Sequence, residues 1–217
     1  MHTRIVTACL AVALVAAAAS SAIAQTVPPA SPLVVHGQAG LTFGGPSGGL
    51  FGAGAGARVG AVPGLTIFGE FGRLTNVMTD DLQDFVDDVA GVDESDDFDF
   101  EFEMRLPATY GFGGARYQIT TNGPLGVFVE GGLGFAHVTS DVSLTVDGID
   151  FSDEFEETLE ESDVVLSTTE MLLVVGGGVS YPVTPRADLT GGLRINRIAA
   201  ADGITKTAVY VGVLWRP

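Results

Sequence analysis

Apolar and polar residues alternate along most of this chain, in short stretches separated by residues that favour turns. Near the end of the chain, for example, Leu193 and Ile195 fall on one face of an extended segment, and Arg194 and Asn196 fall on the other. A period of two is typical of a β-strand that has one apolar face. The pattern predicts eight strands, at 34–44, 49–60, 64–74, 105–119, 125–139, 168–181, 186–197 and 206–216.

The connections between these strands differ in length and composition. Glycine, proline and asparagine mark tight turns at 62–64, 121–124 and 182–185. The other connections, two of them long, are 45–48, 75–104, 140–167 and 198–205. Because consecutive strands run in opposite directions, the tight turns fall at one end and the longer loops at the other. Strands of about 9–11 residues, joined alternately by tight turns and longer loops, predict an all-β fold. The expected architecture is an eight-stranded antiparallel up-and-down transmembrane β-barrel over 34–217, with two long acidic extracellular loops.

The first residues carry an export signal. Arg4 precedes an apolar run, and Ala22-Ile23-Ala24 is a small-x-small cleavage site, so we expect residues 1–24 to be a signal peptide. Residues 25–33 then form a Pro-rich periplasmic lead-in to the barrel domain. The only cysteine, Cys9, leaves with the signal, which removes disulfide and thiol chemistry from the mature chain.

Charged residues also occur within the predicted strands, and we assign five of them to the face opposite the apolar side chains: Arg58, Glu70, Arg116, Glu130 and Arg194. A charge facing lipid at the bilayer midplane costs about 2–4 kcal/mol, so we expect all five to face the lumen. Two interpretations are open, a polar path or gated pore and a buried ion-pair plug. The narrow interior of an eight-stranded barrel favours the plug.

The two long loops contain most of the acidic residues. There are 12 Asp and Glu in 80–103 and 10 in 141–163, out of 27 in the chain. The apolar spacing predicts helices near 82–89 and 151–159 and strands over 98–104 and 142–146. Carboxylates are ligands for hard cations, so one interpretation of these loops is a head that binds divalent cations or a partner. The other, which the pattern favours, is a solvated surface that keeps exposed strand edges from associating. The candidate ligands are Asp93, Glu94, Asp96, Asp97, Asp153, Glu154, Glu156 and Glu157.

Basic residues border the loops at the predicted outer rim: Arg73, Arg105, Arg197 and Lys206. They are suited either to lipopolysaccharide phosphates or to the loop carboxylates above them.

The chain resembles the small outer-membrane barrels of the OmpA/OmpX type, often classed as porin-family or outer-membrane β-barrel proteins. The resemblance covers about residues 33–217 and rests on the strand count, the loop rhythm, the Gly-rich walls and the last strand. Such proteins end in alternating apolar residues closed by an aromatic, which the outer-membrane assembly machinery reads. Val211, Val213 and Trp215 match this signal, although Arg216 and Pro217 follow the aromatic. The resemblance implies the outer membrane, with lipid and lipopolysaccharide as surroundings, and specifies no activity.

The remaining chemistry is sparse. A formal net charge of −17 disfavours nucleic acid as a partner. Outside the signal the only histidines are His36 and His137, predicted at opposite ends of the barrel, and only His137 has Ser140 and Asp141 near it. We therefore expect a monomeric, non-enzymatic barrel without a cofactor other than divalent cations, whose acidic loops bind cations or a surface partner. A narrow cation-favouring channel is the alternative, followed by a lipid-modifying barrel enzyme.

Overall fold

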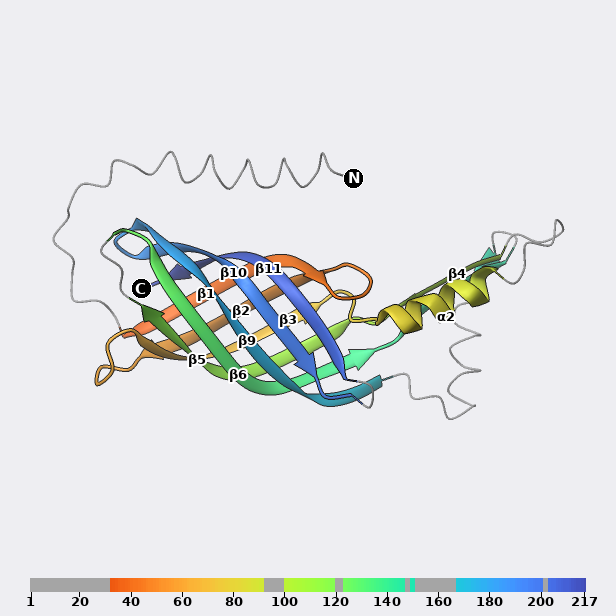
Figure 1. Ribbon diagram of the computed structural model, residues 1–217, viewed down its shortest axis with the longest axis horizontal. Coiled ribbons are helices and arrows are strands. Elements are labelled where there is room, and N and C mark those ends of the chain that lie inside the picture. The colour runs from red at the N-terminus through yellow and green to blue at the C-terminus, as the bar shows by residue number, and fades with distance from the viewer. Residues whose placement is uncertain (1–31, 92–99, 120–122, 147–148, 151–166, 201–202) are drawn as a thin grey trace.

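The computed structural model describes residues 32–91, 100–119, 123–146, 149–150, 167–200 and 203–217. Its main body is a closed barrel of antiparallel strands, each paired with its neighbours along the chain (Figure 1). The barrel strands are β1 (Leu33–Phe43), β2 (Gly48–Arg58), β3 (Leu65–Leu74), β5 (Ala108–Ile119), β6 (Gly126–Thr139), β9 (Ser167–Thr184), β10 (Ala187–Ile198) and β11 (Ile204–Trp215). The first and last strands close the barrel, from Val35 opposite Trp215 to Phe43 opposite Thr207. The predicted all-β, eight-stranded antiparallel barrel is confirmed, with strand limits within a few residues of those expected.

The turn between β9 and β10 differs from the prediction. We expected it at 182–185, but β9 continues through Thr184, and the chain turns at Pro185 and Arg186. The register shifts beside Ala187 and Asp188, which marks a bulge in the ladder. Because a bulge leaves backbone groups unpaired, it accommodates proline inside a strand, and Pro182 therefore does not end β9.

A smaller unit projects from the loop end of the barrel (Figure 1). It consists of α2 (Asp80–Gly91), β4 (Phe100–Arg105), β7 (Asp141–Val146) and β8 (Ile149–Asp150), and we call these four elements the head. β4 pairs with β7, β7 pairs with β8, and α2 packs on β4. The helix expected near 82–89 and the strands expected over 98–104 and 142–146 are present, whereas the helix expected over 151–159 lies outside the described residues.

The start of α2 follows from its sequence. Thr79 is the N-cap, and its Oγ1 accepts a hydrogen bond from the amide of Leu82 at 3.4 Å. Asp80 and Asp81 occupy the first turn, where the helix dipole favours negative charge. No helix in the described part of the chain is long and apolar enough to cross a membrane.

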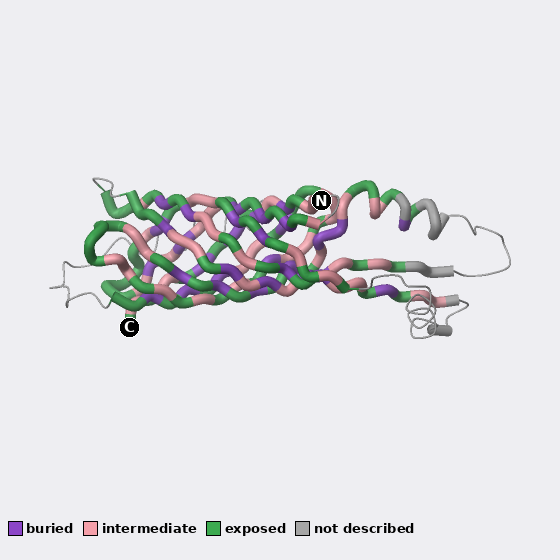
Figure 2. Tube along the Cα trace, turned by 90° about the horizontal axis from the view of Figure 1, so that it is seen from below, coloured by how far each residue is buried: buried purple, intermediate pink, exposed green. Residues whose placement is uncertain are grey.

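The barrel wall has an apolar outer face. Buried and exposed residues alternate along its strands (Figure 2), and large apolar side chains are exposed at successive outward positions. Phe71 and Phe135 are 66% and 65% exposed, and Val211 on the opposite wall is 46% exposed. A contiguous apolar surface of this kind is rare on soluble monomers and is suited to contact with hydrocarbon.

Glycines on the inward face leave room for the side chains inside the barrel. A Cβ atom at Gly52 would lie 2.7 Å from Glu70 Oε1, and one at Gly54 would lie 2.6 Å from the ring of His36. Small inward residues therefore allow long polar side chains from other strands to cross the narrow lumen.

Candidate functional site

Arg194 lies at the centre of the barrel interior and is fully buried. β10 points this side chain inward, where its cross-strand neighbours Gly176 and Ala208 are small. Its guanidinium bridges two carboxylates, with Nη1 2.6 Å from Glu70 Oε1 and Nη2 2.9 Å from Glu130 Oε1. The arginine therefore connects β10 to β3 and β6 across the lumen.

Further donors surround the two carboxylates. Arg116 donates from Nη2 to Glu130 Oε2 at 2.6 Å, and Tyr210 donates to Glu130 Oε1 at 3.1 Å. On the other side, Glu70 accepts from Tyr110 at 2.8 Å and Gln38 at 2.9 Å, and its Oε2 lies 2.9 Å from His36 Nε2. We call these residues the lumen cluster: His36, Gln38, Glu70, Tyr110, Arg116, Glu130, Arg194 and Tyr210.

Aromatic rings pack against the arginines of this cluster. The Arg194 guanidinium lies 5.2 Å from the ring centre of Tyr210 and 5.3 Å from that of Phe112. Arg116 lies 4.4 Å from the ring centre of Phe128. These are cation–π distances, and the rings also exclude water from the ion pairs. The arrangement fills the interior and neutralises its charges, which fits a plug better than an ion path.

Sequence reasoning located only part of this cluster. The structure brings together Glu70, Arg116, Glu130 and Arg194, but Arg58 lies at the turn end of the barrel and does not join them. His36, which we placed at one end of the barrel, is instead a buried member of the cluster. Barrel strands are tilted and staggered, so a residue's position along its strand does not give its depth. The alternation itself was the missed signal, because His36 and Gln38 share the inward face of β1 with Thr42.

The predicted rim residues divide into two groups. Arg73, Arg105 and Arg197 are exposed; Arg105 pairs with Glu103 at 3.1 Å, and Arg197 donates to Thr205 Oγ1 at 2.6 Å. The prediction for Lys206 is wrong, because this side chain points inward and is fully buried. Its Nζ donates to the carbonyl oxygens of Met78 at 2.7 Å and Pro46 at 3.1 Å. It therefore ties the first loop and the start of the head to β11 and cannot reach a lipid phosphate.

The predicted cation ligands, Asp93, Glu94, Asp96, Asp97, Asp153, Glu154, Glu156 and Glu157, all lie outside the described residues. Within the described ranges, no group of three or more His, Cys, Asp or Glu side chains is arranged to hold a metal ion. Cation binding by the loops therefore stays a prediction.

The assembly residues and the second histidine both lie on the outer wall. Val211, Val213 and Trp215 are exposed along β11. His137 is exposed on the same side of β6 as Phe135, and its Nδ1 lies 2.9 Å from Thr169 Oγ1. This geometry links the ring to a neighbouring strand rather than to Ser140 or Asp141.

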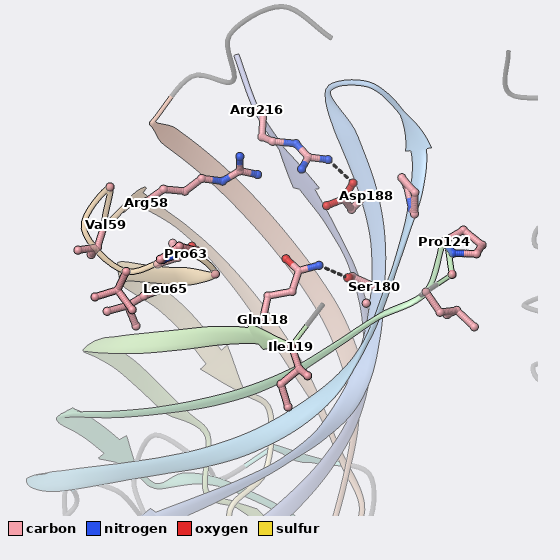
Figure 3. Close-up of a pocket in the computed structure, with 18 residues that line it drawn as sticks. Arg58, Val59, Pro63, Leu65, Gln118, Ile119, Pro124, Ser180, Asp188 and Arg216 are labelled. Atoms are coloured by element: carbon pink, nitrogen blue, oxygen red, sulfur yellow. Dashed lines mark hydrogen bonds and ion pairs between the residues drawn. The ribbon is translucent and has the colours of Figure 1, made fainter. Parts of the chain in front are cut away.

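A cavity of about 580 Å³ opens at the turn end of the barrel (Figure 3). Its polar lining is Arg58, Thr66, Gln118, Ser180, Asp188 and Arg216. Arg216 pairs with Asp188, and Gln118 Nε2 donates to Ser180 Oγ at 3.0 Å. We call this cavity the turn-end mouth. Sequence analysis did not predict this cavity, because it forms where the ends of strands far apart in the chain meet.

Several solved structures are similar to this chain. The N-terminal β-barrel domain of Pseudomonas aeruginosa OprF is 13% identical, with a TM-score of 0.50 over 87% of this chain and 99% of that one. Neisserial surface protein A is 20% identical, with a TM-score of 0.49 over 88% of this chain and 100% of that one. Yersinia pestis Ail, the attachment invasion locus protein, is 13% identical, with a TM-score of 0.45 over 87% of this chain and 99% of that one.

No protein-family model and no curated protein matches the sequence. At these identities the similarity is one of fold. The chain has the eight-stranded β-barrel architecture found in small outer-membrane proteins of the OmpA/OmpX type.

Proposed function

We propose that this protein is an integral outer-membrane β-barrel with a closed lumen, and that it acts through its head as a structural or surface-interaction protein. It is neither an enzyme nor a channel in this proposal. The observation that carries it is the lumen cluster, in which fully buried Arg194 bridges Glu70 and Glu130 across the barrel interior. A barrel whose interior is filled must act through its outer surfaces.

The outer wall supports the membrane location. Large apolar side chains such as Phe71, Phe135 and Leu193 are more than half exposed on the barrel exterior. Contact between such side chains and water is unfavourable, whereas contact with the hydrocarbon of a bilayer is favourable. The tight turns lie at the end where β1 begins and β11 ends. In bacterial outer-membrane barrels the short turns are periplasmic, which puts the head outside the cell and the turn end in the periplasm.

The segments that connect the head to the barrel are held together by specific hydrogen bonds. The amide of Val77 donates to Leu106 O at 2.7 Å, and Asn76 Oδ1 accepts from the amides of Met78 at 3.0 Å and Leu106 at 3.4 Å. Lys206 binds Met78 O from inside the barrel. An anchored head can hold the adjoining acidic loops in a defined place. We propose that those loops bind divalent cations or a surface partner, with lipopolysaccharide contacting the exposed Arg73, Arg105 and Arg197.

Calorimetry with Ca²⁺ or Mg²⁺ tests the cation part. The test variant replaces Asp93, Glu94, Asp96 and Asp97 by Asn or Gln, and a matched control makes the same change in charge at Asp80, Asp81, Asp84 and Asp87 of α2. We expect saturable binding that the test variant loses and the control keeps. Equal loss in both, or no saturable heat in the wild type, would reduce the loops to a solvated acidic surface.

Planar-bilayer recording tests the closed lumen separately. We expect no unitary conductance from the wild-type protein once heat-modifiable migration has shown that it is folded. Stepwise, cation-selective conductance would favour the narrow channel instead, whatever calorimetry gives.

A further inference from the structure

The turn-end mouth contains more positive than negative charge. Arg58 comes from the last residue of β2, Asp188 from β10 and Arg216 from the segment after β11. In Figure 3 both guanidinium groups point into the space beside Asp188. The lining therefore holds two arginines and one carboxylate, and its other polar side chains, Thr66, Gln118 and Ser180, are neutral.

Neither arginine has all its donors satisfied. Arg216 uses one terminal nitrogen to pair with Asp188, but its Nε is buried and has no partner among the described residues. The Arg58 guanidinium forms no hydrogen bond or ion pair with any residue in the described part of the chain. Gln118 Nε2 donates to Ser180 Oγ, and within the described residues neither side chain accepts a hydrogen bond from Arg58 or Arg216.

We propose that the turn-end mouth is a binding site for an oxyanion, a carboxylate or phosphate group held between Arg58 and Arg216. Guanidinium groups present several N–H donors in a plane and match the paired oxygens of these anions. Such a ligand supplies the negative charge that Asp188 alone does not.

The size and position of the cavity define the ligand further. Its volume of about 580 Å³ lies within the range of small-molecule sites. Val62, Ile119 and Leu125 line it as well, so the acid group can be attached to a partly apolar molecule. The donors lie inside the barrel mouth, on the inward side of the wall, which favours a solute or a flexible chain end over a lipid whose tails contact the outer wall.

This inference does not depend on the proposed function. The mouth lies at the opposite end of the barrel from the head, and none of its polar lining residues belongs to the lumen cluster. A failure of the loops to bind cations would therefore not contradict the proposed oxyanion site.

The test measures binding of inorganic phosphate and of acetate to the full-length protein in nanodiscs, by calorimetry at low ionic strength because salt screens an open site. Comparing the two probes distinguishes phosphate from carboxylate recognition. Repeating the titration with zwitterionic and with phosphatidylglycerol-containing discs shows whether an anionic headgroup competes for the same site. Heat-modifiable migration reports the folding of every variant.

Three substitutions make the result specific. Arg58→Gln should weaken binding about tenfold or more, because charge-assisted hydrogen bonds are lost. Arg186→Gln removes the same charge at the same end of the barrel but outside the cavity lining, and should change binding less than about twofold. Asp188→Asn should tighten binding several-fold, because it frees Arg216 for the ligand.

Opposite signs for Arg58→Gln and Asp188→Asn, together with unchanged binding by Arg186→Gln, would establish the site, since damage to the fold weakens binding in both variants and surface charge alone would make Arg186→Gln weaken it as well. Equal weakening by Arg58→Gln and Arg186→Gln would reduce the effect to surface charge and overturn the proposal. Failure of the folded wild type to bind either probe would also overturn it.

Discussion

The barrel interior contains two groups of charged side chains that are built from the same residue types and are satisfied differently. In the lumen cluster, Arg116 and Arg194 face Glu70 and Glu130, and the oxygen atoms of both carboxylates are occupied by donors. In the turn-end mouth, Asp188 pairs with Arg216 and not with Arg58, and part of the donor capacity of both arginines is unused.

Solvent access explains the difference. Removing charged side chains from water costs several kcal/mol per ion. A buried cluster of such side chains must therefore have no net charge, and its donors and acceptors must be hydrogen-bonded. Arg194 and Glu70 meet this requirement at 0% side-chain exposure. The turn-end mouth is open, so water can solvate an excess charge there. Donors that no protein group satisfies therefore cost little stability and remain able to bind a ligand. In the two proposals above, charge pairing closes the middle of the barrel, and charge imbalance makes its end a binding site.

Removing the central arginine should have the largest effect. Arg194→Met leaves Glu70 and Glu130 buried with too few donors, and should lower the free energy of unfolding by about 3–5 kcal/mol. Urea unfolding in lipid vesicles, followed by the fluorescence of Trp215, the only tryptophan, measures it.

Neutralising the carboxylates provides the control. Adding Glu70→Gln and Glu130→Gln to Arg194→Met should restore part of the lost stability, because the uncompensated charges disappear. A loss below about 1 kcal/mol in the single variant would show that water reaches the cluster and that the lumen is not closed.

The same two regions also differ in the space around their glycines, with a smaller expected effect on the free energy of unfolding. A Cβ atom at Gly114, inside the barrel, would lie 2.5 Å from Gly131 O, whereas one at Gly60 near the mouth would have no atom within 4 Å. We expect Gly114→Ala to cost about 1–3 kcal/mol and Gly60→Ala to stay within about 0.5 kcal/mol. The same urea experiment compares them, and similar values would mean that the middle of the barrel has spare room.

The sequence allowed most of the architecture to be predicted, because a period of two assigns each residue to one face. The alternation around Leu193 and Arg194 was sufficient to place one outside and the other inside. Where we inferred depth from position along a strand, the prediction failed. His36 belongs to the central cluster, Arg58 lies at the mouth, and Lys206 lies beneath the first loop instead of on the rim.

These errors have a common physical origin. Depth in a barrel depends on strand stagger, which results from pairing between strands distant in sequence, such as β1 with β11. The mouth was missed for the same reason, since Arg58, Asp188 and Arg216 meet only after the barrel has closed. In the sequence, Arg216 was only a residue that follows Trp215, the final aromatic of the assembly signal.

The smallest expected effect on stability belongs to Arg58, and it separates the two regions most clearly. Arg58 is partly exposed and unpaired within the described residues, so Arg58→Gln breaks no ion pair and should change the free energy of unfolding by less than about 0.5 kcal/mol. Removing it also relieves repulsion from Arg216, which opposes any loss. The same variant is expected to weaken oxyanion binding about tenfold. A residue that matters for a ligand and not for the fold is a binding residue, whereas a stability loss close to that of Arg194→Met would make Arg58 part of the structural charge network that its sequence pattern first indicated.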